Sequence, residues 1–403
     1  MADPWAPIAE PACHICGAPA LQHLLPNAKL GRVTSDCRPW PAGGKLCVCA
    51  DCGCIQKAID AEWLDDVGRI YAAYDIYHQS GGIEQGIFTP DSTAMAPRSQ
   101  RLLQGLNVYF DLPRQGRMLE IGCGNGALLR SFSSLRSDWV LVGQDLGERQ
   151  REAVEAIAGP GAFFSCPAHE VPGQFDLVIM NHVLEHIPDP SGFLAGLRGK
   201  IAAGGLLLIQ VPNTWRKPFD LLEVDHASHF TPPAVRWITA RAGYSVSGMP
   251  DLVSRETTVL ARVDTCESGQ KPGNSSEVLR WASQCLEWLI GMRDHARSLT
   301  RSCRLGIFGT SIAGTWLGGE LGEAVSFFVD EDRHRVGRNH LGRPILHPSE
   351  TPVSSHVYMA LESDMAEQIA LRLAHDGIDM NAVLPPPAPQ WEESASDSHS
   401  EGS

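Results

Sequence analysis

Four cysteines near the N-terminus have the spacing of a metal site. Cys13 and Cys16 form one C-x-x-C pair, and Cys49 and Cys52 form a second pair further along the chain. Each pair can bind one side of a Zn²⁺ ion from a tight turn, and four thiolates complete a tetrahedral structural site. We therefore expect one structural zinc ion bound by these four cysteines.

The same block contains other groups that could bind metal, so the ligand set stays open at this point. They are Cys37, Cys47, Cys54 and His14. A set of free buried thiols is the alternative to a metal site. A redox role is less favoured because neither C-x-x-C pair opens a helix after a strand. Because the block has few periodic apolar positions, we expect a bound metal to supply much of its folding free energy.

A glycine-rich loop follows a short apolar strand in the segment 117–126, which reads Arg-Met-Leu-Glu-Ile-Gly-Cys-Gly-Asn-Gly. Glycine allows the backbone to approach a ligand where a Cβ atom would clash. The spacing of Gly122, Gly124 and Gly126 differs from the dinucleotide pattern G-x-G-x-x-G. The run, with Glu120 before it, resembles motif I of class I S-adenosylmethionine (SAM) methyltransferases. This resemblance implies that Glu120 and the three glycines bind SAM.

Further cofactor contacts are expected where the next strands end. Asp145 ends the second strand, at the position where an acid accepts hydrogen bonds from ribose hydroxyls. Cys166 follows the third strand, at the usual position of adenine contacts. The apolar run Phe175–Asn181 predicts a buried parallel strand. Asn181 and His182 therefore lie at its carboxyl end, where ligands bind in open α/β sheets.

Two histidines are candidates for acid–base chemistry. His186 lies in a Leu-Glu-His-Ile segment that resembles one found in many small-molecule methyltransferases, although a core-facing or capping role is the alternative. Asp225 precedes His226 after the fifth strand. Histidine is the natural general base near neutral pH, and a neighbouring acid can orient it. We therefore expect His226 to act as a base oriented by Asp225.

Alternating strand and helix patterns predict an α/β fold with a seven-stranded sheet of the class I SAM-methyltransferase type. A zinc-binding module precedes it and a Rossmann-like α/β domain follows it. The expected strands of the sheet are 117–121, 139–144, 162–166, 175–181, 205–211, 245–253 and 257–263. The expected segments of the chain are a zinc-binding module (1–60), a helical connector (61–90), the methyltransferase core (91–264), a linker and helix (265–300), the Rossmann-like domain (301–385) and a disordered acidic tail (386–403).

Composition and charge exclude several functions. The net charge of −14 and the lack of a Lys/Arg-rich stretch disfavour a nucleic-acid partner. No apolar run approaches the roughly 20 residues of a membrane helix, and residues 1–5 lack the features of a signal peptide. We therefore expect a cytoplasmic protein, in which cysteines serve as thiols or metal ligands. The sequence does not specify the oligomeric state.

Taken together, the pieces resemble the three-part sugar C-methyltransferases of deoxysugar biosynthesis. These have a zinc-binding module, a SAM-binding core and a Rossmann-like C-terminal domain that shares in holding the nucleotide sugar. The resemblance rests on the second cysteine knuckle (45–56), the Tyr-His-x-Ser-Gly stretch (77–81), His186, the acid–His pair at 225–226 and the closing pattern from Phe328 to Pro348. It implies that Tyr77 faces the active site and that His226 is the base.

Two departures from that family concern the acceptor side. Val253–Glu256 replaces the usual His-Gly-Gly-Ser stretch, and Asp225 replaces a glutamate beside the base. In the C-terminal domain, the segment 309–314 lacks the full dinucleotide pattern, which argues against NAD binding there.

The leading hypothesis is transfer of a methyl group from SAM to a carbon beside a keto group on a nucleotide-linked deoxysugar. Because carbon must first lose a proton, a base is required to form an enolate, and Tyr77 and His186 are candidates for holding the keto oxygen. The first alternative is O- or N-methylation of another small molecule or glycan precursor. The second is a non-catalytic protein that keeps the SAM fold.

Overall fold

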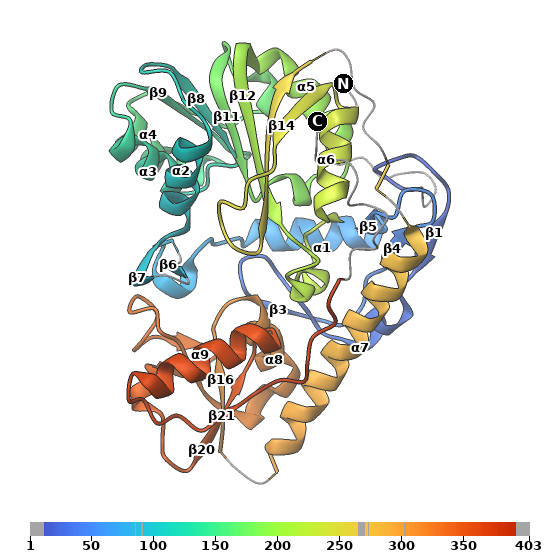
Figure 1. Ribbon diagram of the computed structural model, residues 1–403, viewed down its shortest axis with the longest axis vertical. Helices are drawn as coiled ribbons and strands as arrows, with labels where there is room; N and C mark the ends of the chain where they lie inside the picture. Colours follow the sequence, from blue (N-terminus) through green and yellow to red (C-terminus); the bar gives the residue numbers. More distant parts are fainter. Residues whose placement is uncertain are drawn as a thin grey trace.

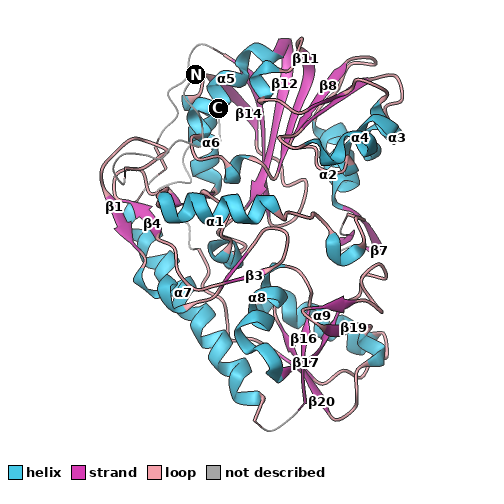
Figure 2. Cartoon of the chain, turned by 180° about the vertical axis from the view of Figure 1, so that it is seen from behind, coloured by secondary structure: helices cyan, strands magenta, loops and turns pink. Residues whose placement is uncertain are grey.

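The computed structural model describes residues 12–84, 86–89, 92–264, 271–272, 274–301 and 304–391. Three larger β-sheets organise this part of the chain. In both views a large sheet with its helices lies at one end and a smaller α/β unit at the other, with helix α1 (Ala61–Ala72) between them (Figures 1 and 2). No described helix combines the length and the apolar composition that a membrane span requires.

The largest sheet has seven strands in the order β10-β9-β8-β11-β12-β15-β14. The first five are parallel, and β15 and β14 close the sheet in antiparallel orientation. This order and orientation confirm the expected class I SAM-methyltransferase fold. The strands are β8 (Arg117–Ile121), β9 (Val140–Gln144), β10 (Phe163–Phe164), β11 (Phe175–Asn181), β12 (Ile201–Pro212), β14 (Tyr244–Gly248) and β15 (Glu256–Val263).

Both faces of this sheet are buried, which explains the continuous apolar runs of its strands. In β11, Leu177 and Ile179 join one apolar cluster, whereas Val178 and Met180 join the cluster on the opposite face. This alternation follows from the two-residue period of a strand. Helices α2 (Arg98–Tyr109), α3 (Ala127–Leu135) and α4 (Arg151–Ala158) contribute to the first cluster, and α5 (Pro190–Leu197) and α6 (Pro232–Arg241) to the second.

The N-terminal sheet combines distant parts of the sequence. Its order is β1-β4-β5-β13, with β1 (Leu21–His23), β4 (Leu46–Cys49) and β5 (Ile55–Lys57) from the first 60 residues. Strand β13 (Ser228–His229) comes from the segment after β12 and pairs antiparallel with β5. The segment that carries His226 is therefore hydrogen-bonded into the N-terminal module.

The C-terminal unit contains a six-stranded sheet in the order β18-β19-β17-β16-β20-β21. Helices α8 (Ile312–Leu321) and α9 (Ser363–His375) pack on it. Helix α7 (Ser275–Leu299) runs along one side of the molecule toward this unit (Figure 1). Its buried face shares one apolar cluster with the N-terminal module and with this unit. The strands are β16 (Arg304–Phe308), β17 (Val325–Val329), β18 (Asn339–His340), β19 (Arg343–Leu346), β20 (Ser355–Met359) and β21 (Ala382–Val383).

The structure departs from the sequence-based expectations in one strand end, in the connector and in the tail. Strand β14 ends at Gly248, whereas the sequence predicted a strand to residue 253. The connector is helical only in α1 and in the 3-10 helix η2 (His78–Ser80), and a hairpin of β6 (Gly86–Thr89) and β7 (Ser92–Pro97) follows. In the tail that was expected to be disordered, the Trp391 ring stacks on Trp215 with ring centroids 4.4 Å apart. The Trp288 indole donates a hydrogen bond to the carbonyl of Pro386. Residues 392–403 lie outside the described part of the chain.

The Trp391 stack generates a stability prediction. Replacing Trp391 with Ala removes aromatic contacts with Trp215 and Trp281, and we expect a loss of about 1–3 kcal/mol in the free energy of unfolding. Denaturant titration measures the loss. Val353→Ala, at a side chain that is 98% exposed, is the control and should change stability little. Equal stability of the two variants would contradict a structural role for residues 386–391.

Candidate functional site

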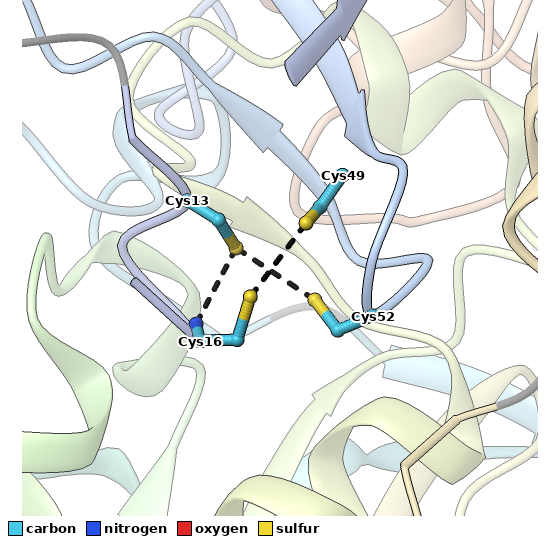
Figure 3. Close-up of side chains that lie close together, drawn as sticks. All are labelled: Cys13, Cys16, Cys49 and Cys52. Atoms are coloured by element: carbon cyan, nitrogen blue, oxygen red, sulfur yellow. Dashed lines mark hydrogen bonds between the residues drawn. The ribbon is translucent and has the colours of Figure 1, made fainter. Parts of the chain in front are cut away.

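The four predicted zinc ligands lie close together in the N-terminal module. Their sulfur atoms all lie within 4.8 Å of one another and point toward a common centre (Figure 3). The Sγ atoms of Cys13 and Cys52 are 3.7 Å apart, and those of Cys16 and Cys49 are 3.6 Å apart. Tetrahedral zinc with bonds of about 2.3 Å holds neighbouring sulfurs about 3.8 Å apart. The cluster therefore has the dimensions of a zinc site.

Both knuckles are built in the same way. Each C-x-x-C pair is followed by a glycine in the left-handed region, Gly17 at φ +81° and Gly53 at φ +72°. The amide of each glycine donates to the carbonyl of the first cysteine of its pair. The side chain of Gln56 donates a hydrogen bond of 3.0 Å to the sulfur of Cys13, as expected of a group that orients a metal ligand.

The competing metal-binding groups lie elsewhere. The Cys47 sulfur contacts His23 Nδ1 at 3.3 Å, and His14 Nε2 contacts the Ser228 hydroxyl at 2.9 Å. In the described part of the chain, the four-thiol group contains neither these residues nor Cys37 or Cys54. Burial raises the pKa of the Cys16 thiol to about 12, so a cluster of thiolates here requires a compensating cation. The donor set thus fits Zn²⁺.

The three glycines of the loop after β8 have different tasks. All three have positive φ, which a Cβ atom disfavours. A Cβ on Gly122 would meet Val183 at 2.5 Å, and one on Gly126 would meet Ile157 at 2.8 Å, so these positions are needed for packing. A Cβ on Gly124 would meet no atom closer than 3.8 Å and would project into the cavity described below. Gly124 is therefore the position where a ligand can approach the backbone.

A cavity of about 2470 Å³ extends from this loop to the C-terminal unit. Typical small-molecule sites measure about 300–1,000 Å³, so the cavity has room for two ligands at once. Its wall includes Glu120 and Asn181, and each has a buried side-chain oxygen without a hydrogen-bond partner in the described structure. Burial raises the pKa of Glu120, with the nearby Glu84 adding to the effect. Buried polar atoms of this kind require a partner, which a bound ligand would supply.

The remaining predicted cofactor residues lie around the same end of the cavity. The Asp145 carboxylate accepts hydrogen bonds from the amides of Gly124, at 3.0 Å, and of Leu146, at 2.7 Å. His182 also lines the cavity, with Nδ1 3.1 Å from Glu185, and burial lowers its pKa to about 4. Cys166 is not part of the lining. Its carbonyl accepts a hydrogen bond from Gln144, and the next residues along the chain line the cavity instead.

Backbone strain accumulates around this cavity. Among the described residues other than glycine, five have positive φ, and four of these line the cavity. Such conformations persist only where the surroundings enforce them, and they concentrate at functional sites. The four residues are Cys37 (φ 62°), Tyr77 (φ 60°), His182 (φ 55°) and Arg255 (φ 70°).

His226 lies in a buried cluster of acids and imidazoles. Its Nδ1 is 2.7 Å from Asp220 and its Nε2 is 3.2 Å from Glu223. Asp220 also accepts hydrogen bonds from the Thr214 hydroxyl, at 2.6 Å, and from His229 Nδ1, at 3.1 Å. Burial lowers the pKa of His226, but the carboxylates of Glu223 and Asp220 outweigh burial and raise the pKa to about 10. The imidazole is therefore charged at neutral pH.

The expected pairing of His226 with Asp225 is wrong. The Asp225 carboxylate accepts hydrogen bonds from the amide of Ser35, at 2.9 Å, and from its hydroxyl, at 2.5 Å, and it does not line the cavity. Although Asp225 and His226 are adjacent in sequence, their side chains have different neighbours. The carboxylate that orients the His226 ring is that of Asp220. His186 contacts both His226 and Asp225. The centre of its ring is 4.7 Å from that of His226, and its Nδ1 is 3.0 Å from the Asp225 carbonyl oxygen.

Sequence reasoning missed Asp220 and gave Glu223 no role. The available signal was their spacing of three residues, Asp220, Glu223 and His226, directly after Pro218. A proline favours the first turn of a helix, and residues three apart share one side of a 3-10 helix. The structure has such a helix, η7 (Pro218–Leu222), with Glu223 as its C-terminal cap. Tyr77, the fourth predicted catalytic residue, lines the same cavity, and burial raises its pKa.

The cysteine geometry predicts one tightly bound zinc ion per chain. A Cys49→Ser/Cys52→Ser variant should lose the ion together with the fold of the N-terminal module, because two thiolates cannot complete the site. Elemental analysis and circular dichroism measure both losses. Cys47→Ser is the matched control, since that thiol lies on β4 outside the cluster, and it should retain zinc. Full zinc content in the double variant would contradict this ligand set.

Comparison with known proteins finds similarity in the central part of the chain. A family model described as a methyltransferase domain matches residues 93–247. The ubiquinone biosynthesis O-methyltransferase of Cereibacter sphaeroides is 31% identical over 171 residues, covering 40% of this chain and 64% of that protein. The enzyme of that name from Pseudomonas aeruginosa is 30% identical over 105 residues, covering 24% and 44%. The chain thus spans less than two thirds of the length of these relatives.

Solved structures with a similar region include human N-acetylserotonin methyltransferase in complex with SAM. It is 20% identical, with a TM-score of 0.36, and covers 41% of this chain and 52% of that one. CalO1, a methyltransferase in calicheamicin biosynthesis, is 18% identical, with a TM-score of 0.35, and covers 41% and 53%. At these scores the similarity adds nothing to the assignment. Residues 93–247, which match the methyltransferase family model, contain six of the seven strands of the large sheet at least in part, and the cysteine cluster and the six-stranded sheet lie outside the matched residues.

Proposed function

We propose that this protein is a SAM-dependent methyltransferase that methylates a carbon atom of a nucleotide-linked keto-deoxysugar. The observation that carries the proposal is one large cavity in the described part of the chain. It extends from the glycine loop of the methyltransferase domain to the edge of the C-terminal sheet, past the His226 cluster. A methyl donor and a second, larger molecule can both fit in a space of about 2470 Å³.

The residues around Gly124 fit SAM. Asp145 can accept hydrogen bonds from ribose hydroxyls, and the open backbone at Gly124 leaves room for the amino-acid tail. The partnerless oxygens of Glu120 and Asn181 can accept hydrogen bonds from an ammonium group. SAM supplies an electrophilic methyl group on a sulfonium.

The other end of the cavity supports a large acceptor. Arg255 belongs to the segment Val253–Glu256, which replaces the His-Gly-Gly-Ser stretch of the sugar C-methyltransferases. It lines the cavity and forms an ion pair of 2.5 Å with Glu362 of the C-terminal unit. Lys217 pairs with Glu256 at 2.5 Å nearby. The Arg255–Glu362 pair joins the part of the chain with the seven-stranded sheet to the C-terminal unit, so an acceptor that binds here can contact both.

Carbon methylation requires removal of a proton from the acceptor, and the His226 cluster is the proposed place for it. His226 and Glu223 both line the cavity, and Asp220 fixes the imidazole from behind. Tyr77 and His186 line the same cavity and are proposed to hold the keto oxygen as negative charge builds on it.

A second candidate function is O-methylation. The ubiquinone biosynthesis relatives are O-methyltransferases by name, and they are 30–31% identical to this chain over 105–171 residues. A buried acid–imidazole pair would also deprotonate a hydroxyl group. Product analysis separates the two readings, because only carbon methylation forms a new C–C bond. A non-catalytic protein of the same fold is the third reading, and failure to bind SAM would favour it.

We predict binding of one SAM or S-adenosylhomocysteine molecule per chain. Gly124→Val should block binding, because the added side chain fills the space at the loop. Asp145→Ala should weaken binding by about 1.5–3 kcal/mol through lost charge-assisted hydrogen bonds. Isothermal titration calorimetry measures both. Asp138→Ala, an exposed acid outside the cavity, is the control. Wild-type affinity in both test variants would exclude this site.

We predict that His226→Asn lowers turnover by about 10²–10⁴-fold and leaves the affinity for S-adenosylhomocysteine nearly unchanged. The assay uses labelled SAM and a thymidine-diphosphate-linked keto-deoxyhexose. His375→Asn, on the exposed surface of α9, is the control. His229 is unsuitable for this purpose because it contacts Asp220, which also binds His226. Near-wild-type turnover of His226→Asn would rule out this cluster as the proton acceptor.

A further inference from the structure

We propose that Glu223, rather than the imidazole of His226, takes the proton from the acceptor, and that His226 is its positively charged partner. This inference rests on the proposed methyltransferase function and assigns the proton-accepting group of the same site. It changes the role expected for His226 from free base to fixed cation.

Both ring nitrogens of His226 are already engaged. Nδ1 faces Asp220 at 2.7 Å, and Nε2 faces Glu223 at 3.2 Å. With Nδ1 hydrogen-bonded to Asp220 and Nε2 in an ion pair with Glu223, neither ring nitrogen points freely at an acceptor.

Glu223 has the geometry that His226 lacks. Its Oε2 contacts His226, and no hydrogen-bond partner is found for Oε1 among the described residues. The residue lines the cavity as the cap of the 3-10 helix η7. Its backbone is fixed by the bridge between Glu223 and Val33 and by the bond from the Val224 amide to the Val33 carbonyl. One carboxylate oxygen is thus anchored and the other is free to meet an acceptor.

The electrostatics of the pair support the same division of roles. Burial raises the pKa of Glu223 to about 8, even though the charge of His226 opposes this. The pKa of His226 rises to about 10. Between these values Glu223 is a carboxylate beside an imidazolium, and a base is most effective when its pKa lies near the working pH.

The charged and titratable groups around the pair come from every element packed against it. Most act on Glu223 or His226 by charge, and Asp220 also by a hydrogen bond. They are Asp220 of η7, His229 of β13, Lys57 of β5, Arg32 of the short strand β2 (Arg32–Val33), Glu185 and His186 of the 3-10 helix η5 (Leu184–His186), and Asp225 and Lys217 of the surrounding loops.

The reaction consists of a proton transfer to Glu223 followed by a methyl transfer to carbon. The proton of the acceptor carbon moves to Oε1 of Glu223, and the electron pair of the broken C–H bond stays on the acceptor as an enolate. That pair then forms the bond to the methyl carbon. The S–CH₃ pair returns to sulfur, and S-adenosylhomocysteine leaves with the product. Glu223 finally releases its proton to water through the cavity.

The test compares Glu223→Gln with the wild type. Gln keeps the shape of the side chain but cannot accept the proton, so turnover of a thymidine-diphosphate-linked keto-deoxyhexose should fall about 10²–10⁴-fold. Deuterium uptake at the acceptor carbon, run in D₂O with S-adenosylhomocysteine bound, should be lost as well. Wild-type turnover should rise with pH through about 8, where Glu223 ionises, and the residual rate of the variant should lack this rise. Glu152→Gln, an exposed acid on α4 outside the cavity, is the matched control.

A readout that needs no acceptor separates this inference from the proposed function. In ¹⁵N-histidine NMR spectra, the imidazolium of His226 should persist well above neutral pH in the wild type and titrate at lower pH in Glu223→Gln. A neutral His226 at pH 7, or a Glu223→Gln variant with turnover within threefold of wild type, would overturn the role of Glu223. Failure of the wild type to bind S-adenosylhomocysteine would instead contradict the proposed function. The NMR spectra would still show whether Glu223 keeps His226 positively charged.

Discussion

The pairing of strand β13 with β5 is the constraint on which the site depends. Ser228 lies opposite Gln56, and Gln56 donates a hydrogen bond to a sulfur of the cysteine cluster. One residue further, His229 contacts Asp220, and Asp220 holds His226. A short antiparallel contact thus connects the four-cysteine cluster to the cavity through consecutive hydrogen bonds. The N-terminal module is therefore part of the structure that positions the acid–imidazole cluster, although it lies outside the methyltransferase domain.

The burial of so many charges in this cluster is tolerated because each is compensated. Asp220 accepts three hydrogen bonds from side chains, and His226 lies between the carboxyl groups of Asp220 and Glu223. An isolated charge in such surroundings would shift its pKa until it became neutral. Removing one member leaves its partners uncompensated, so substitutions here affect stability as well as chemistry. Binding measurements beside rate measurements are needed to separate these effects.

The sequence predicted those features that depend on local pattern. For the strands at 117–121 and 175–181, the first and last residues were both predicted correctly, because buried parallel strands are continuous apolar runs between polar residues. The four cysteines were identifiable because knuckle spacing is itself a geometric requirement. By contrast, β13 has two residues and no periodicity, and its partner lies some 170 positions earlier in the sequence. Adjacency suggested Asp225 as the partner of His226, whereas a 3-10 turn brings Asp220 to the ring.

The packing of helix α7 has a consequence for synthesis of the chain. Leu30, Leu46 and Ile55 of the N-terminal module share one apolar cluster with α7 and with Trp316 of α8. During translation the module emerges before residues 93–247, but the side chains that cover this face are made only after them. Metal binding can order the cysteine knuckles early, while the face opposite α7 waits for the C-terminal unit. A segment that is synthesised early is thus among the last to complete its core.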